Sequence, residues 1–242
     1  MLKYNGSILK VNNGQSIIGS VTFSPTYPSD MDFIYLANNY NGSQIPNVIT
    51  TSDMGPYLKT GTITKNGSGS SCYLTNAGSD SNYLYIDLTS DRLNAMKANS
   101  GTYTYFIRVI STLSGIGGVI SWRKDGSTYI YMIRSNSGQL QVHTNSGINL
   151  GTTNFSLASD NVYKVWVNGT SYNAKNLTSG YTWNTSNSST KTMYSRMLSF
   201  SADSSGSSEA KLGQFYGIAG IARATTDEED ELIKAYLLSQ GV

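Results

Sequence analysis

Short hydrophobic runs alternate with polar positions along most of the chain, and clusters of Gly, Asn, Asp and Ser separate them about every 8–12 residues. This spacing predicts an antiparallel all-β sandwich or barrel. Tyr103–Ile110 carries apolar side chains on both strand faces, which is typical of a strand buried between two layers. Tyr83–Leu88 is predicted as a further strand, and Met193–Phe200 and Phe215–Arg223 as the strands that close the β region.

Turn dipeptides mark hairpins within this pattern. Asp125-Gly126 separates the apolar run Val119–Arg123 from Tyr129–Arg134, and Asn168-Gly169 follows Val162–Val167. Asp-Gly and Asn-Gly supply the positive φ angles that a two-residue hairpin turn needs. Both places are therefore predicted as tight antiparallel hairpins.

The two ends of this pattern are less regular. Residues 1–44 are predicted as a small hairpin around Asn5-Gly6 followed by an irregular segment, with a strand at Phe33–Leu36. We assign this segment an attachment or oligomerisation role and place the main domain at residues 45–242. Residues 178–192 are polar and are predicted as a loop.

The last residues change from strand to helix spacing. Thr226 with Glu229 three residues later forms a capping-box signature, and acidic side chains fill the first turn, where the helix dipole favours anions. Gly241 is a suitable stop. The predicted fold is thus all-β with one short C-terminal α-helix, whose apolar face must pack on the β body. That face holds Leu232, Ile233, Tyr236 and Leu237.

Composition excludes several classes of protein. The chain has 242 residues, a net charge of +2 and only 13% charged residues, against about 25% in an average domain. It has no basic clusters, which argues against nucleic-acid binding, and no apolar stretch near the ~18 residues of a membrane helix, which argues against membrane insertion. The single Cys72 forbids an internal disulfide.

The acidic residues disfavour catalysis. Glycosidases usually need two carboxylates, yet the first 208 residues contain no Glu, and Asp30 and Asp32 are the closest Asp pair. His143 is the only histidine and is predicted as an ordinary strand residue. We therefore predict no catalytic residues and no metal site, while an Asp-based polysaccharide-degrading enzyme stays open as an alternative.

A set of motifs carries a family resemblance. Gly213–Arg223 followed by Thr225–Glu229 resembles the closing strand and helix of the concanavalin A-like lectin/glucanase superfamily, in its laminin-G-like (LamG) jelly-roll branch. Val165–Gly169 and Asn82–Ile86 match two further strands of this pattern. Tyr103–Val109 matches another, with Arg108 where the family usually has Trp. The likeness covers roughly residues 45 to 242.

The resemblance implies a two-sheet antiparallel jelly-roll sandwich that binds glycans or proteins. Catalytic members of the branch carry a Glu-x-Asp-x-x-Glu strand, which this sequence lacks. We predict no cofactor. A calcium site at Asp30 and Asp32 stays open as an alternative, since laminin-G-like domains often hold one. The acidic run 227–231 is better explained by helix capping.

The initiator Met, the lack of a signal-peptide run and the polar surface make the chain similar to bacteriophage virion proteins. The leading hypothesis is a non-catalytic tail- or head-fibre receptor-binding module of the virion that recognises a host cell-surface glycan. A purely structural capsid decoration or fibre protein, in contact only with other virion proteins, is the alternative. A homo-oligomer such as a trimer fits both, and a bacterial cell-surface or extracellular location also stays open.

The candidate ligand-binding residues are Trp183, Tyr181 and Asn184. Sugars stack their C–H faces on aromatic rings and bond to amides through their hydroxyls, and these residues lie in a polar stretch without an obvious core. Trp122 and Trp166 lie in predicted strands and are expected to pack in the core.

Overall fold

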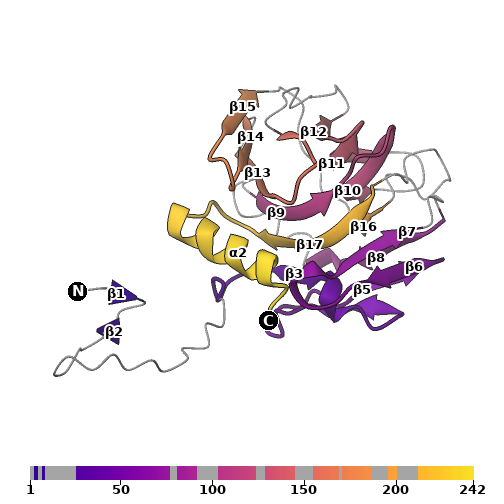
Figure 1. Ribbon diagram of the computed structural model, residues 1–242, viewed down its shortest axis with the longest axis horizontal. Coiled ribbons are helices and arrows are strands. Elements are labelled where there is room, and N and C mark those ends of the chain that lie inside the picture. Colours follow the sequence, from indigo (N-terminus) through magenta and orange to yellow (C-terminus); the bar gives the residue numbers. More distant parts are fainter. Residues whose placement is uncertain are drawn as a thin grey trace.

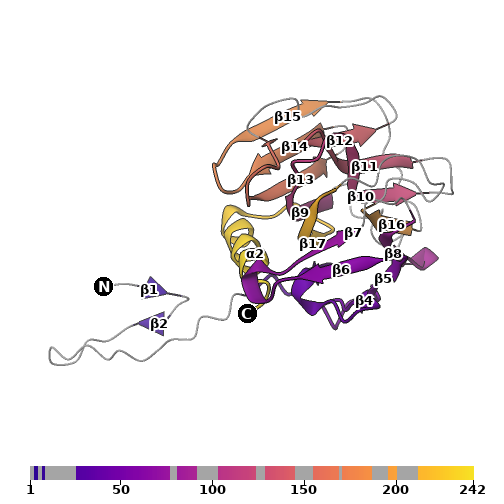
Figure 2. The same ribbon diagram turned by 45° about the vertical axis from the view of Figure 1, so that its right-hand side comes forward.

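The computed structural model describes residues 3–4, 7–8, 26–76, 81–91, 103–123, 129–144, 155–168, 171–186, 196–200 and 212–242. Within these ranges the chain forms two stacked antiparallel β-sheets and a C-terminal α-helix (Figures 1 and 2). The predicted two-sheet sandwich with one short terminal helix is confirmed. No helix in these ranges has the length and apolar character needed to cross a bilayer.

One sheet has seven strands in the order β12-β11-β10-β16-β8-β5-β4. In chain order they are β4 (Gln44–Ile45), β5 (Tyr57–Thr60), β8 (Tyr83–Asp87), β10 (Ile116–Arg123), β11 (Tyr129–Asn136), β12 (Gln139–Thr144) and β16 (Arg196–Ser199). The hairpin predicted around Asp125-Gly126 is present as the β10–β11 pair, although the turn itself lies outside the described residues.

The other sheet has eight strands, seven of them in the order β15-β14-β13-β9-β17-β7-β6, while β3 pairs with β17 beside this path. In chain order they are β3 (Phe33–Leu36), β6 (Ile63–Asn66), β7 (Tyr73–Asn76), β9 (Tyr103–Ile110), β13 (Val162–Asn168), β14 (Ser171–Asn176), β15 (Thr182–Ser186) and β17 (Gln214–Ile221). Because β3 belongs to this sheet, the sandwich includes residues on the N-terminal side of the boundary expected at residue 45.

Short elements complete the chain. The predicted N-terminal hairpin is present as β1 (Lys3–Tyr4) paired with β2 (Ser7–Ile8). Among the described residues, the 3-10 helices η1 (Ala37–Asn39) and η2 (Gly69–Ser71) connect strands of the sandwich.

The main hydrophobic core lies between the two sheets. Tyr105 of β9 and Trp122 of β10 are fully buried there, and the indole Nε1–H of Trp122 donates to Tyr105 Oη at 2.7 Å. This confirms core packing for Trp122, with its one polar hydrogen satisfied as burial requires. Gly220 of β17 allows a close approach in the same region, because a Cβ there would overlap the Phe33 ring.

The helix α2 (Asp227–Ser239) covers the outer face of the eight-stranded sheet. It lies against β9, β13 and β17, and is yellow in Figure 1. Ile233 and Leu237 pack there in a second apolar cluster with Phe106 and Ala219. The predicted capping box is present: Thr226 Oγ1 accepts from the Glu229 backbone N–H, and Glu229 accepts from the Thr226 N–H. In the described part of the chain, this helix therefore forms a third layer on the sandwich.

Arg108 stands where the laminin-G-like pattern usually has Trp, and its contacts explain this difference. Its guanidinium is buried and forms two hydrogen bonds to the Asp160 carboxylate, at 2.8 and 2.7 Å. Its Nη1 donates to the carbonyls of Leu237 and Leu238 in the last turn of α2, where a cation is favoured. Its charge also lies 4.4 Å from the centre of the Tyr216 ring. Arg108 thus anchors the end of the helix to the sheet.

Candidate functional site

The predicted ligand-binding residues lie at the edge strand β15. The loop expected over residues 178–192 is wrong for Thr182–Ser186, which pairs antiparallel with β14 from Ser171 to Lys175. Residues 178–181 form no strand, and residues 187–192 lie outside the described part of the chain. One face of this strand is exposed and the other is only partly buried, and four of its five side chains are polar, so the apolar alternation that marks a strand is weak. The site is therefore built on a strand rather than on a loop.

Tyr181 and Trp183 belong to the face of the sheet that points into the sandwich. Trp183 lies opposite the buried Ala174 and packs, partly buried, against the main core. Tyr181 keeps 36% of its surface exposed, and its ring meets the buried Phe155 edge to face, with centroids 5.5 Å apart. The strand pairing extends to Tyr181, whose carbonyl accepts from the Asn176 N–H at 2.9 Å. Two aromatic rings thus lie at the edge of the core that is bordered by β15.

Asn184 lies on the opposite, outer face, since neighbouring strand residues point to opposite sides. It is exposed and pairs with Asn173, which in turn pairs with Trp166 of β13. The predicted trio is therefore divided: the structure brings Tyr181 and Trp183 to one face, and Asn184 joins Trp166 on the other.

The core position expected for Trp166 is wrong. Val165 and Val167 point into the main core, so Trp166 between them faces outward and is only partly buried. Sequence reasoning placed the turn at Asn168-Gly169, which pairs Trp166 with Ser171, whereas in the structure Asn168 pairs with Ser171 and Trp166 with Asn173. What it lacked was the knowledge that this part of the outer face is uncovered.

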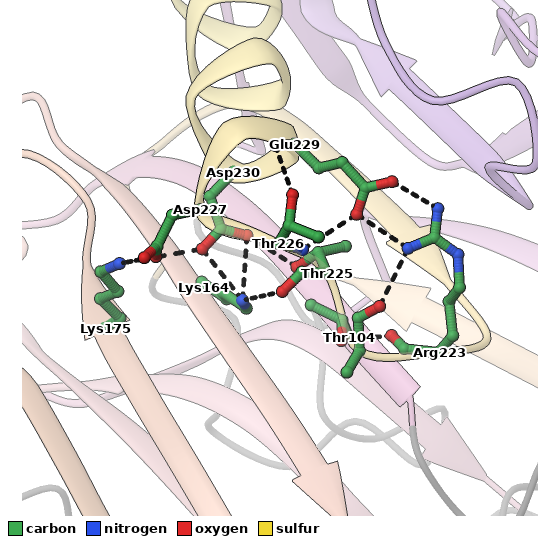
Figure 3. A network of polar contacts seen from close by, with 10 residues as sticks. Thr104, Lys164, Lys175, Arg223, Thr225, Thr226, Asp227, Glu229 and Asp230 are labelled. Carbon is green, nitrogen blue, oxygen red and sulfur yellow. Dashed lines mark hydrogen bonds and ion pairs between the residues drawn. The ribbon is translucent and has the colours of Figure 1, made fainter.

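The charged groups beside Trp166 are paired with the start of α2 (Figure 3). Lys164 Nζ lies 2.9 Å from Asp230 Oδ1 in a buried ion pair, and Lys175 Nζ lies 2.7 Å from Asp227 Oδ1. Lys164 Nζ also lies 4.8 Å from the centre of the Trp166 ring, a cation–π distance. The helix terminus and the Trp166 ring therefore share one cation.

Asp30 and Asp32 are engaged separately. Arg223 donates to both oxygens of Asp30, at 2.6 and 2.8 Å, and also to both oxygens of Glu229 (Figure 3 shows the Glu229 side). Hydrogen bonding from Arg223 lowers the pKa of Asp30. The buried Asp32 accepts from Tyr103 Oη at 2.9 Å. A glycosidase acid needs a raised pKa, which is the opposite of what Arg223 produces at Asp30.

The same arrangement bears on calcium. Asp30 already binds a cation, the Arg223 guanidinium, through both carboxylate oxygens. Over the described ranges, no group of three or more His, Cys, Asp and Glu side chains is placed to hold a metal ion. As expected, the acidic run 227–231 fills the start of α2, with Glu229 in the capping box. Asp227 and Asp230 of this run also pair with lysines.

Two single residues remain. His143 lies in strand β12, as predicted, and its backbone pairs with Met132 of β11. Cys72 is buried in the main core, and burial raises the pKa of its thiol. This is the environment of a packing residue rather than of a nucleophile.

No protein-family model matches the chain, and no curated protein sequence matches it. Solved structures do. A Trypanosoma rangeli sialidase in complex with 2,3-difluoro-KDN matches with a TM-score of 0.61 and 12% identity over 90% of this chain and 33% of that one. The same sialidase in complex with sialic acid gives a TM-score of 0.57 at 11% identity, over 90% and 34%.

The binding domain of botulinum neurotoxin serotype D/C VPI 5993 matches with a TM-score of 0.54 and 9% identity, over 86% of this chain and 52% of that one. The chain therefore spans between a third and about half of the length of these structures. Similarity at such low identity establishes the shared sandwich fold, which agrees with the concanavalin A-like pattern in the sequence. The neighbours include both enzymes and a binding domain.

Proposed function

We propose that this chain is a non-catalytic glycan-binding module. The observation that carries the proposal is the pair Tyr181 and Trp183. These two large aromatic side chains keep accessible surface at the edge strand β15 of the sandwich. Because Tyr181 packs against the buried Phe155, its ring is oriented before any ligand arrives. A pre-oriented ring loses little entropy when a sugar stacks on it.

The fold supports the same class of ligand. Two of the similar structures are of one sialidase, bound to sialic acid and to 2,3-difluoro-KDN, and a third is a toxin binding domain. We extend carbohydrate binding to this chain as a proposal, at the residues that this sequence itself supplies.

The non-catalytic part of the proposal rests on the carboxylates. Asp30 is bound by Arg223 and Asp32 by Tyr103, so neither is placed as a free acid or base beside the other. An Asp-based polysaccharide-degrading enzyme is the alternative. Release of reducing sugar that disappears in Asp30→Asn or Asp32→Asn would establish that alternative.

The proposal is tested by binding to a glycan array, with the protein, Tyr181→Ala and Trp183→Ala compared. We expect binding to a defined set of glycans and its loss in both variants. Thr64→Ala is the matched control, since Thr64 is an exposed strand residue at the opposite edge of the same sheet. Tyr181 is exposed, so its variant tests binding even where Trp183→Ala lowers stability. An array without any bound glycan refutes the proposal.

We further propose that the module belongs to a phage virion and contacts a host-surface glycan. The alternative is a structural virion protein that contacts only other virion proteins. Strand β15 supports this alternative, because it is an edge strand without a charged residue or proline that would block strand pairing between molecules. Light scattering coupled to gel filtration distinguishes the two functions. A stable trimer that binds no glycan favours a structural virion protein.

A further inference from the structure

The outer face of β13, β14 and β15 carries three parallel rows of side chains, one residue from each strand in every row. The rows follow from the strand register, because paired residues lie side by side on one face. From the helix outward they are Lys164–Lys175–Thr182, then Trp166–Asn173–Asn184, then Asn168–Ser171–Ser186.

The first row contacts α2 through its two lysines. These lysines form ion pairs with Asp227 and Asp230, the first and fourth residues of the helix (Figure 3). The helix begins there, and the other two rows extend away from its start. Of their six residues, four are exposed and two, Trp166 and Asn173, are partly buried. We call these two rows the outer-face patch.

The outer-face patch has a uniform chemistry. It consists of one indole ring, three amides and two hydroxyls, and none of its six side chains is charged. The lysines at its border are neutralised by the carboxylates of α2. Amides and hydroxyls exchange hydrogen bonds with sugar hydroxyls, and an indole face stacks on sugar C–H groups. The outer-face patch therefore offers no unpaired charge to a ligand, which favours an uncharged one.

The Trp166 ring is held in place on the outer face of β13. The core does not need it, because Val165 and Val167 fill the inner face of β13. Its ring is fixed by the Lys164 ammonium at 4.8 Å, and Lys164 is in turn fixed by the buried Asp230. An aromatic ring that is immobilised beside exposed amides is a preorganised stacking surface.

We propose that the outer-face patch binds a neutral oligosaccharide chain that runs across β13, β14 and β15. This site rests on the proposed glycan-binding function but is separate from Tyr181 and Trp183, which lie on the other side of the sheet. The row from Trp166 to Asn184 spans two strand spacings, about 10 Å, which is longer than a single sugar ring. The recognised unit is therefore a stretch of chain.

The test observes the indole N–H signals in ¹⁵N NMR spectra. The three tryptophans lie in three places: Trp122 in the core, Trp166 in the patch and Trp183 at the inner edge. Their signals are assigned from tryptophan-to-phenylalanine variants. The probes are hexasaccharides of β-1,4-glucose, α-1,4-glucose and β-1,4-mannose, together with 3′-sialyllactose as the charged sugar.

We expect at least one neutral hexasaccharide to shift the Trp166 signal and sialyllactose to leave it unchanged. Trp166→Ala should weaken this binding at least about tenfold, equivalent to about 1.4 kcal/mol of binding free energy. Asn184→Ala should weaken it measurably, and since Asn184 is exposed, this variant keeps the test valid even where Trp166→Ala folds poorly. Thr64→Ala is again the control that should bind normally.

Four results overturn the inference. Sugar binding that shifts only the Trp183 signal, or that Trp166→Ala and Asn184→Ala leave intact, refutes the patch while the proposed function stands. A Trp166 shift caused by sialyllactose alone refutes the neutral ligand class. The absence of binding to every sugar, on the array and by NMR, refutes the patch and the proposed function together.

Discussion

The buried ion pair between Lys164 and Asp230 should be essential to the attachment of α2. Lys164 Nζ lies 2.9 Å from each Asp230 oxygen, and the side chains are only 8% and 2% exposed. Replacement by Lys164→Met leaves the carboxylate buried with the Thr225 hydroxyl at 2.6 Å and Lys175 at 3.9 Å. Removal of one partner of a buried pair costs about 3–5 kcal/mol. Because Lys175 partly compensates, we expect the lower value, about 3 kcal/mol.

This loss is measured by urea unfolding followed by circular dichroism, and by calorimetry. A chain of this length loses about 2 °C of Tm per kcal/mol, so Lys164→Met should melt about 6 °C lower. The double variant Lys164→Met/Asp230→Leu removes both charges and should regain at least half of the loss, because no charge stays buried. Equal destabilisation in the single and double variants would show that packing, and not the unpaired carboxylate, causes the effect.

Three further outcomes follow from the contacts around α2 and the core. Arg108→Lys loses the planar fork that holds the helix end, so we expect a loss of about 2 kcal/mol by urea unfolding; an unchanged midpoint contradicts the anchoring role. Arg223 lowers the pKa of Asp30 and of Glu229, so its stabilisation is complete above about pH 5 and is lost as the pH falls below about 4. Between pH 7 and 3 the Tm should therefore fall more in the wild-type protein than in Arg223→Gln, and parallel curves would refute this. Burial and a raised pKa should keep Cys72 unreactive toward a thiol reagent at pH 8 until urea unfolds the chain, and labelling of the native protein would contradict its position.

The local elements of this fold were accessible from sequence because local chemistry determines them. The capping box at Thr226 and Glu229 involves residues three apart, and it forms as predicted. Strand β9 was identified from apolar side chains on both faces, and those faces do pack on the two hydrophobic clusters of the fold. Such patterns need no knowledge of distant partners.

The candidate site was only partly accessible. The sequence identified Tyr181 and Trp183 as aromatic residues in a polar stretch, but not that the stretch is a strand. Its strand character comes from backbone pairing with β14, which its own polar side-chain pattern does not indicate. Pairing also separates Asn184 from the two aromatic residues, because a strand alternates its faces.

By itself, the sequence determined the class of fold, the terminal helix and the scarcity of carboxylates suited to catalysis. The tertiary structure alone decided which surfaces are exposed. Lys164 and Asp230 lie 66 residues apart, and Arg108 and Leu237 lie 129 apart, so no local pattern indicates that they meet. These contacts fix where α2 begins and ends on the sheet. They thereby decide that Lys164 lies under the helix, while Trp166, two residues further along the strand, borders the exposed part of the outer face.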